Sequence, residues 1–378
     1  MIRNHTLLFS FLVVFMIASC GKEESPTVNP NIDSNSGSIK IIHDDFENTP
    51  LVIVGNEVQS YMLAFDRTLA DGTILNFEAK QRSLPDILQD AEGNIWNHQG
   101  LATSGPREGQ RLTKVNAYTG FWFAWGTMYP EMELYDGTSS TSGFQQNPPV
   151  TGWNIPTETV LTVLGPDAIP AVDDPKFEVY DAKDAIDNGY FLEEDDMVIG
   201  VTVNQQTRLY PIRILNWHEI VNDVIGDQHF SVSFCPLTNT TVVWDRNIDG
   251  NITTFGVSGL LYNSNVMPYD RESGSIWSQM TQDCVTGALI DTEFETYQVF
   301  TTTFATWKTM LSTLNVLSTD TGFGKDYDIN PYASYLTNDE FIAYPIEYHD
   351  TRLLNKETIL GVEINGKAKG YRFNDFED

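Results

Sequence analysis

Residues 230–246 read FSVSFCPLTNTTVVWDR, and residues 51–67 read LVIVGNEVQSYMLAFDR. Each stretch joins two β-prone runs through a short polar turn, and each ends in the dipeptide Asp-Arg. The echo continues in the same order, so that the Gly-Asn-Ile-Trp of residues 93–96 corresponds to the Gly-Ser-Ile-Trp of residues 274–277. Matches that keep their order over so long a segment indicate a duplicated architecture.

A second echo runs in the opposite order and indicates a circular permutation. Residues 198–212, VIGVTVNQQTRLYPI, resemble residues 359–373, ILGVEINGKAKGYRF. The first of these segments precedes its partner stretch, whereas the second follows it near the end of the chain. Unit one is therefore contiguous over residues 198–317, and unit two combines residues 359–373 with residues 40–134. Because the two segments of unit two must form one compact unit, residues 41–44 should lie close to residues 371–373.

The residue patterns of both units predict strands joined by tight turns, with a few short helices. The Asn-Gly of residues 365–366 predicts a β-hairpin, and the apolar spacing in residues 214–223 predicts a helix. We therefore expect an α+β fold, mainly antiparallel β, in which two pseudo-symmetric repeat units form one domain over residues 40–378 and one unit is circularly permuted. The long connections, residues 136–197 and 318–358, should cover the core or carry function.

The N-terminal residues predict export and lipid anchoring. Residues 1–19 hold a basic start and an apolar run that is shorter than the about 20 residues of a membrane-spanning helix, as is typical of a secretory signal peptide. The Ile-Ala-Ser-Cys of residues 17–20 resembles a bacterial lipobox, in which Cys20 would receive the lipid. Residues 20–39 are rich in Ser, Pro, Asn and Gly, so they predict a flexible tether.

Charge limits the partners of the exported chain. The Lys-Glu-Glu of residues 22–24 resembles the acidic export tag of surface lipoproteins, so we expect a cell-envelope protein anchored to the outer membrane, and the tag favours surface exposure. The formal net charge of −30 should repel nucleic acid and anionic lipid headgroups. The expected partners are therefore the membrane, through the lipid on Cys20, and a small molecule or an envelope protein.

Several segments together resemble a known family. Residues 169–177, 233–246 and 320–332 read IPAVDDPKF, SFCPLTNTTVVWDR and DTGFGKDYDINPY. With their neighbours they resemble the exported bacterial and archaeal family catalogued as domain of unknown function 3179, over roughly residues 165–373. That family carries no agreed activity, so the resemblance implies none. Its usual pattern here is Cys-Pro-Leu-Cys, and Thr238 in place of the second cysteine argues against a two-thiol redox or two-thiolate metal role.

The duplication serves as an internal control for choosing functional residues. Features shared by both units, such as Asp245 and its counterpart Asp66, most simply serve the common fold, whereas polar residues found in one unit only are candidates for function. Cys235 corresponds to Asn56, and His218 corresponds to an apolar residue. The candidate ligand-binding residues selected in this way are His218, Cys235, Thr238, Asn239, Ser258, Asn263 and Asn265.

Three kinds of chemistry could involve these residues. Cys235 could act as a nucleophile activated by His218; Cys235, His218 and Met267 could carry a copper-like metal; or the polar groups could bind a ligand without chemistry. Cys235 could also be inert, either packed or joined to Cys284 in a disulfide. We favour a binding module for a small polar ligand or an envelope partner, because this function requires least of the residues. The sequence assigns no catalytic residue, cofactor or metal ligand.

Overall fold

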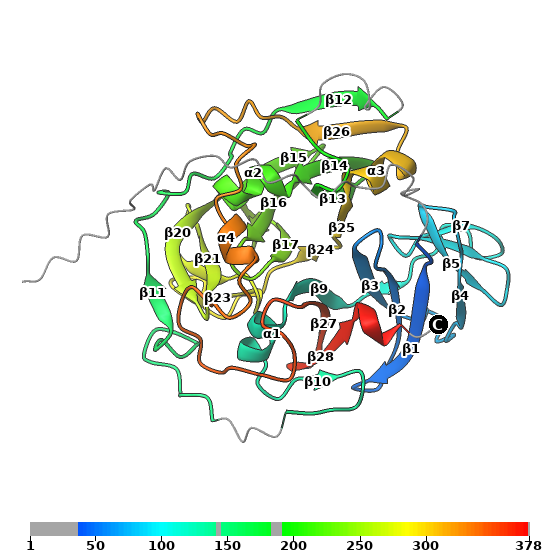
Figure 1. The fold of residues 1–378 in the computed structure, drawn as a ribbon, viewed down its shortest axis with the longest axis horizontal. Coiled ribbons are helices and arrows are strands. Elements are labelled where there is room, and N and C mark those ends of the chain that lie inside the picture. Colours follow the sequence, from blue (N-terminus) through cyan, green and yellow to red (C-terminus); the bar gives the residue numbers. More distant parts are fainter. Residues whose placement is uncertain (1–36, 141–144, 183–190, 377–378) are drawn as a thin grey trace, which may run out of the picture. The chain divides into compact units, whose positions relative to one another are not determined.

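The computed structural model describes residues 37–140, 145–182 and 191–376 (Figure 1). Strands hold 44% of the residues and helices 9%, and most strand pairs are antiparallel, so the predicted mainly antiparallel α+β class is confirmed. The predicted signal peptide, Cys20 and most of the tether lie outside the described residues. Within the described ranges, no helix is both long and apolar enough to cross a membrane.

The first sheet of each unit is built on a hairpin. In unit one the strands in spatial order are β12 (Phe177–Asp181), β26 (Thr313–Leu317), β14 (Gln206–Pro211), β13 (Met197–Val203) and β25 (Phe300–Thr303). In unit two they are β10 (Glu133–Leu134), β28 (Lys367–Arg372), β27 (Thr358–Ile364) and β9 (Asn116–Phe121). Each sheet contains one parallel pair, β14 with β26 and β28 with β10, at equivalent places.

The second sheet of each unit contains one of the two similar segments, residues 230–246 in unit one and residues 51–67 in unit two. In unit one the order is β15 (Ile220–Ile225), β16 (Gln228–Cys235), β17 (Thr240–Asp245) and β24 (Thr296–Tyr297). In unit two it is β1 (Lys40–Phe46), β2 (Thr49–Asn56), β3 (Tyr61–Asp66) and β8 (Thr113–Lys114). The strand order and the antiparallel pairing agree throughout.

The third sheet of each unit is a meander. In unit one it contains β11 (Val160–Thr162), β20 (Phe255–Tyr262), β21 (Asn265–Asp270), β22 (Ile276–Ser278) and β23 (Asp283–Thr286), next to a small ladder of β18 (Asn247–Ile248) and β19 (Asn251–Ile252). In unit two it contains β4 (Phe77–Ala79), β5 (Asp86–Asp90), β6 (Ile95–Asn97) and β7 (Ala102–Ser104). Among the described strands of this sheet, β11, which comes from a connection between the units, lacks a counterpart in unit two, as do β18 and β19 of the small ladder.

Short helices follow equivalent strands in the two units. Helix α2 (Ile212–His218) follows β14 as the 3₁₀ helix η1 (Phe373–Asp375) follows β28, and α3 (Phe304–Met310) follows β25 as α1 (Trp122–Met128) follows β9. The helix predicted over residues 214–223 was too long, because α2 ends at His218 and β15 begins two residues later. The residue between them, Glu219, has φ +57°, which a helix cannot continue.

The packing of one tryptophan on one glycine recurs in both units. Trp307 lies against Gly200, and Trp125 lies against Gly361. A Cβ atom at Gly200 would come within 2.0 Å of the Trp307 ring, and one at Gly361 within 2.1 Å of the Trp125 ring. Both sites therefore require glycine, because no side chain fits so close to an indole.

The two chain ends of unit two meet, as the permutation predicts. The Tyr371 hydroxyl donates to Asp44 Oδ2 at 2.8 Å, and Lys369 Nζ lies 2.6 Å from the same carboxylate oxygen. In unit one, where the chain is continuous, Tyr210 donates to Asp223 at 2.5 Å in the same way. Figure 1 shows the red β28 and the blue β1 on the same side of the structure. The circular permutation is thus closed by a hydrogen bond that unit one also has.

The units contact each other through equivalent turns, which defines an approximate two-fold axis. The backbone N–H of Phe121 donates to the carbonyl of Thr238, in the β16–β17 turn, at 2.8 Å. The hydroxyl of Thr302 donates to the carbonyl of Gln59, in the equivalent β2–β3 turn. Unit one therefore places the end of β25, just before α3, against the β2–β3 turn, and unit two places the end of β9, just before α1, against the β16–β17 turn.

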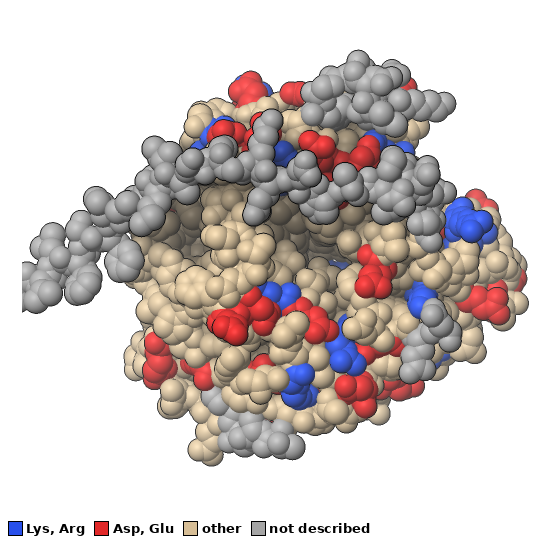
Figure 2. Space-filling model, in the orientation of Figure 1, with Lys and Arg blue, Asp and Glu red and all other residues tan. Residues whose placement is uncertain are grey.

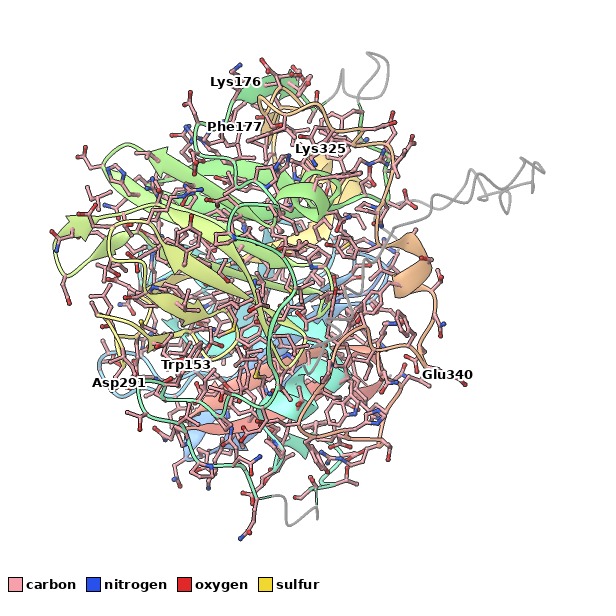
Figure 3. All side chains as sticks on the ribbon, turned by 90° about the vertical axis from the view of Figure 1, so that its left-hand side faces the viewer. Trp153, Lys176, Phe177, Asp291, Lys325 and Glu340 are labelled. Carbon is pink, nitrogen blue, oxygen red and sulfur yellow. The ribbon has the colours of Figure 1, made fainter. Side chains whose placement is uncertain are left out.

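Two long connections join the units. The connection before β13 adds β11 to the third sheet of unit one and β12 to its first sheet. Figure 3 shows Trp153 beside Asp291 at one end of its path and Phe177 at the other. The second connection, residues 318–357, contains α4 (Ala333–Leu336), and we call it the α4 connection. Both connections pack on unit one, and the α4 connection also contacts unit two, where Trp122 Nε1 donates to the carbonyl of Asp350 at 3.0 Å.

Candidate functional site

Two of the predicted residues, Thr238 and Asn265, lie together in a buried polar network. Asn265 Nδ2 donates to Thr238 Oγ1 at 2.9 Å and to Gln279 Oε1 at 2.8 Å. The hydroxyl of Thr240 also donates to Gln279, whose Nε2 donates to Ser233 Oγ at 3.0 Å. All five side chains are buried. A network this well connected fixes the β16–β17 turn in place.

His218 is fully buried and both of its ring nitrogens have partners. Nδ1 lies 2.7 Å from the carbonyl oxygen of Pro170, and Nε2 lies 2.6 Å from the hydroxyl of Tyr327. A carbonyl only accepts, so Nδ1 carries the proton and Nε2 accepts from Tyr327. Burial lowers the pKa of this imidazole below its usual range. Neither nitrogen is therefore available to bind a metal or to deprotonate Cys235 unless these hydrogen bonds break.

Ser258 and Asn263 are buried at the β20–β21 hairpin and bond to the backbone or to neighbouring segments. The hydroxyl of Ser258 donates to the carbonyl of Met267. Asn263 Oδ1 accepts from the hydroxyl of Thr159 at 3.0 Å and from the backbone N–H of Glu347 at 2.8 Å. These contacts attach both connections to the hairpin.

The α4 connection covers the polar residues that are specific to unit one. Besides the Tyr327 contact with His218, its Tyr335 hydroxyl donates to the carbonyl of Leu237 at 2.8 Å, and its Tyr344 carbonyl accepts from Ser264 at 2.8 Å. Figure 1 shows α4 in front of the sheet strands of unit one. Many of the polar groups that are found only in unit one therefore form hydrogen bonds with the α4 connection.

Cys235 is a buried free thiol. It is 1% exposed and packs in an apolar cluster with Val266 and Met280. Burial, and then the nearby carboxyl of Glu219, raise the pKa of this thiol to about 11, so it stays protonated at neutral pH. Cys284 is also buried and free, so neither cysteine of the described residues forms a disulfide. The environment of Cys235 is the opposite of the electropositive one that activates a nucleophilic cysteine.

Glu219 lies beside Cys235, and the sequence patterns did not single it out. The residue is 7% exposed, and the contact of its Oε1 with the hydroxyl of Tyr332, at 3.5 Å, is a long hydrogen bond. Burial raises the pKa of this carboxyl to about 7. Its backbone lies at φ +57° and ψ −30°, a strained conformation for a residue with a side chain. Backbone strain and a buried acid with a shifted pKa both occur most often at functional sites.

A cleft opens next to this region, on the approximate two-fold axis, and we call it the axial cleft. Its volume is about 240 Å³. The elements that line it surround the centre of the view in Figure 1, where Figure 2 shows a hollow. Its lining residues are Ser60, Thr119, Met197, Ile212, Phe234, Asn239, Thr241, Thr301, Thr358 and Phe373. Of the residues predicted from the sequence, only Asn239 is among them.

Equivalent residues of the two units face each other across the axial cleft. Ser60 and Asn239 hold the same turn position, with φ +55° and +54°. Thr119 and Thr301 hold the same position in β9 and β25, as their pairing with β27 and β13 shows. The backbone N–H of Phe234, whose ring lines the cleft, donates to the carbonyl of Glu219 at 2.8 Å. The strained acid therefore supports one wall of the cleft.

The polar side chains of the axial cleft are free to meet a ligand. Among the described residues, the side chains of five of its lining residues form no hydrogen bond: Thr119, Asn239, Thr241, Thr301 and Thr358. A smaller cavity of about 50 Å³ shares Thr119, Thr241 and Thr301 with the cleft, but it has room only for water. Over the part of the chain described here, no three His, Cys, Asp or Glu side chains are grouped as a metal ion would need.

Comparisons with known proteins identify the family of this chain and no closer relative. The model of a family described as protein of unknown function (DUF3179) matches residues 24–132 and 166–378, and the chain belongs to that family. The unmatched residues between these ranges include β11. A search of curated proteins and a search of solved structures found no match.

Proposed function

We propose that the protein is an exported, lipid-anchored binding module that holds a small polar ligand in the axial cleft. One observation carries the proposal: five polar side chains without intramolecular partners converge on a cleft of about 240 Å³ whose other lining residues, except Ser60, are apolar. Such a combination of apolar walls and a few unpaired polar groups is typical of small-molecule sites.

The burial of Cys235 and His218 favours binding over thiol or metal chemistry. A thiol with a pKa of about 11 gives little thiolate at neutral pH. The imidazole of His218 bonds to Pro170 and Tyr327, and not to the thiol. A copper-like carrier or a thiol enzyme would require the α4 connection to move away first, whereas the axial cleft is open as it stands.

The sequence supports the envelope location. A signal-like N-terminus ending in Ile-Ala-Ser-Cys, with a polar tether behind it, favours a lipid on Cys20 and a domain held beyond the membrane surface. A module tethered in this way meets solutes of the envelope or of the medium, and its acidic surface keeps it from anionic lipid headgroups.

Blocking the cleft tests the proposed function. In unit one, Met197 holds the position that Thr358 holds in unit two, so the fold accepts a methionine there. Ligand-observed NMR would screen a library of small neutral and charged fragments against the full chain in detergent, and against Thr358→Met. Thr292→Met, at a half-buried site outside the cleft, is the matched control.

We expect Thr358→Met to weaken the binding of the cleft ligands at least tenfold, and Thr292→Met to leave it unchanged. If no fragment binds in a way that Thr358→Met changes, the axial cleft is not a binding site and the proposed function is wrong.

A further inference from the structure

The lining of the axial cleft carries no charge. None of its ten lining residues is Lys, Arg, His, Asp or Glu, in a chain of which 20% is charged. Two adjoining cavities each contain a lysine, and both lysines already have partners. Lys114 Nζ donates to the carbonyl of Thr296 at 2.5 Å and to its hydroxyl at 2.6 Å, and Lys356 Nζ donates to the carbonyls of Tyr335 at 2.7 Å and Phe341 at 2.8 Å. A charged ligand would lose hydration here without gaining a counter-charge, which is costly. The lining therefore favours a neutral ligand.

The polar groups of the cleft lie on opposite sides of it. Thr119 and Ser60 come from unit two, and Thr301 and Asn239 come from unit one at equivalent positions. A ligand with a single polar end would satisfy one side and leave the other unpaired. A ring with hydroxyl groups around its edge would reach both sides.

Apart from Thr241 and Thr358, the remaining walls are apolar, and they suit the C–H faces of such a ring. Phe234, Phe373, Ile212 and Met197 supply them. The volume of about 240 Å³ lies below that of pockets for drug-sized ligands, which is about 300–1,000 Å³. The ligand is therefore small, with polar edges and apolar faces.

We propose that the axial cleft binds a neutral ring polyol of monosaccharide size, with the equivalent hydroxyls of Thr119 and Thr301 on opposite edges of the ring. This inference rests on the proposed function and narrows its ligand to one chemical class. Because Thr119 and Thr301 hold equivalent positions in the two units, the loss of either hydroxyl should weaken ligand binding to a similar extent.

Saturation-transfer NMR titrations of the full chain can test the class. The neutral probes are glucose, galactose, mannose and N-acetylglucosamine; the charged probes are glucuronate and glucosamine; and cyclohexanol is the ring with one hydroxyl. Each is titrated into the unchanged protein, Thr119→Val, Thr301→Val and the control Thr292→Val, which removes a half-buried hydroxyl outside the cleft.

We expect at least one neutral sugar to bind at least tenfold more tightly than the charged probes and cyclohexanol. Thr119→Val and Thr301→Val should each weaken it about fivefold or more, since each removes one hydrogen-bonding partner, and Thr292→Val should not. Tighter binding of a charged probe or of cyclohexanol that depends on Thr119 and Thr301 would overturn the polyol class and leave the proposed function standing. Absence of any binding sensitive to either threonine would also overturn the inference, and the Thr358→Met screen decides separately whether the cleft binds anything.

Discussion

Glu219 combines a buried carboxyl group with a backbone in the left-handed region, and both features destabilise a folded chain. It ends α2 and its carbonyl holds the backbone of Phe234 in the wall of the axial cleft. The sequence could not reveal this, because the apolar spacing continues past Glu219 to Val221 and favours an unbroken helix. Tertiary packing ends the helix at His218, one turn before the end predicted from the apolar spacing.

A pH dependence of stability follows from Glu219. Burial raises its pKa from 4.5 to about 7, so the folded state binds this proton more tightly than the unfolded state does. Its contribution to stability is thus fully present below pH 4.5 and is lost as the pH rises through about 7, a difference of about 3 kcal/mol. We expect Glu219→Gln to reduce the loss of unfolding free energy between pH 5 and pH 8, measured by urea denaturation. The exposed Glu340→Gln is the control, and an identical pH slope in Glu219→Gln and the unchanged protein would contradict the assignment.

At the scale of elements, the sequence predicted the duplication because turns, tryptophans and aspartates recur in both units. It did not predict the axial cleft. Selecting polar residues unique to unit one favoured His218 and Asn263, which hold the α4 connection. The cleft instead uses shared positions such as Thr119 and Thr301. A comparison that selects residues unique to one unit does not pick out such positions, and only the three-dimensional pairing of the units brings them together.

The equivalence of the units predicts matched effects at the two tryptophan–glycine contacts. Gly200→Ala and Gly361→Ala would each force a methyl group to about 2 Å from an indole ring, and we expect each to destabilise the fold by about 1–3 kcal/mol or more. The measurement is the thermal midpoint of unfolding. Gly324→Ala, where no atom lies within 4 Å of the added methyl group, should leave it unchanged. A large effect at one of the two glycines and none at the other would contradict the equivalence.

At the scale of the whole molecule, the proposed lipid anchor on Cys20 predicts where the protein is found. We expect the unchanged protein to incorporate an alkyne-labelled fatty acid in a bacterial host and to sediment with membranes, and Cys20→Ser to lose the label and appear in the soluble fraction. The lipid is the expected attachment, because the Ile-Ala-Ser-Cys of residues 17–20 resembles a lipobox. Cys284→Ser is the control for a general effect of losing a thiol. Membrane association that persists without label in Cys20→Ser would contradict the anchor.

The central claim is that the space between the two units, on their shared axis, is where a ligand binds. The most direct measurement is a crystal structure of the protein soaked with the strongest hit of the fragment screen. We predict electron density for the hit in the axial cleft, with polar atoms within hydrogen-bonding distance of Thr119 on one side and Thr301 on the other. Density for the hit elsewhere on the protein, with the axial cleft filled by water alone, would contradict the account.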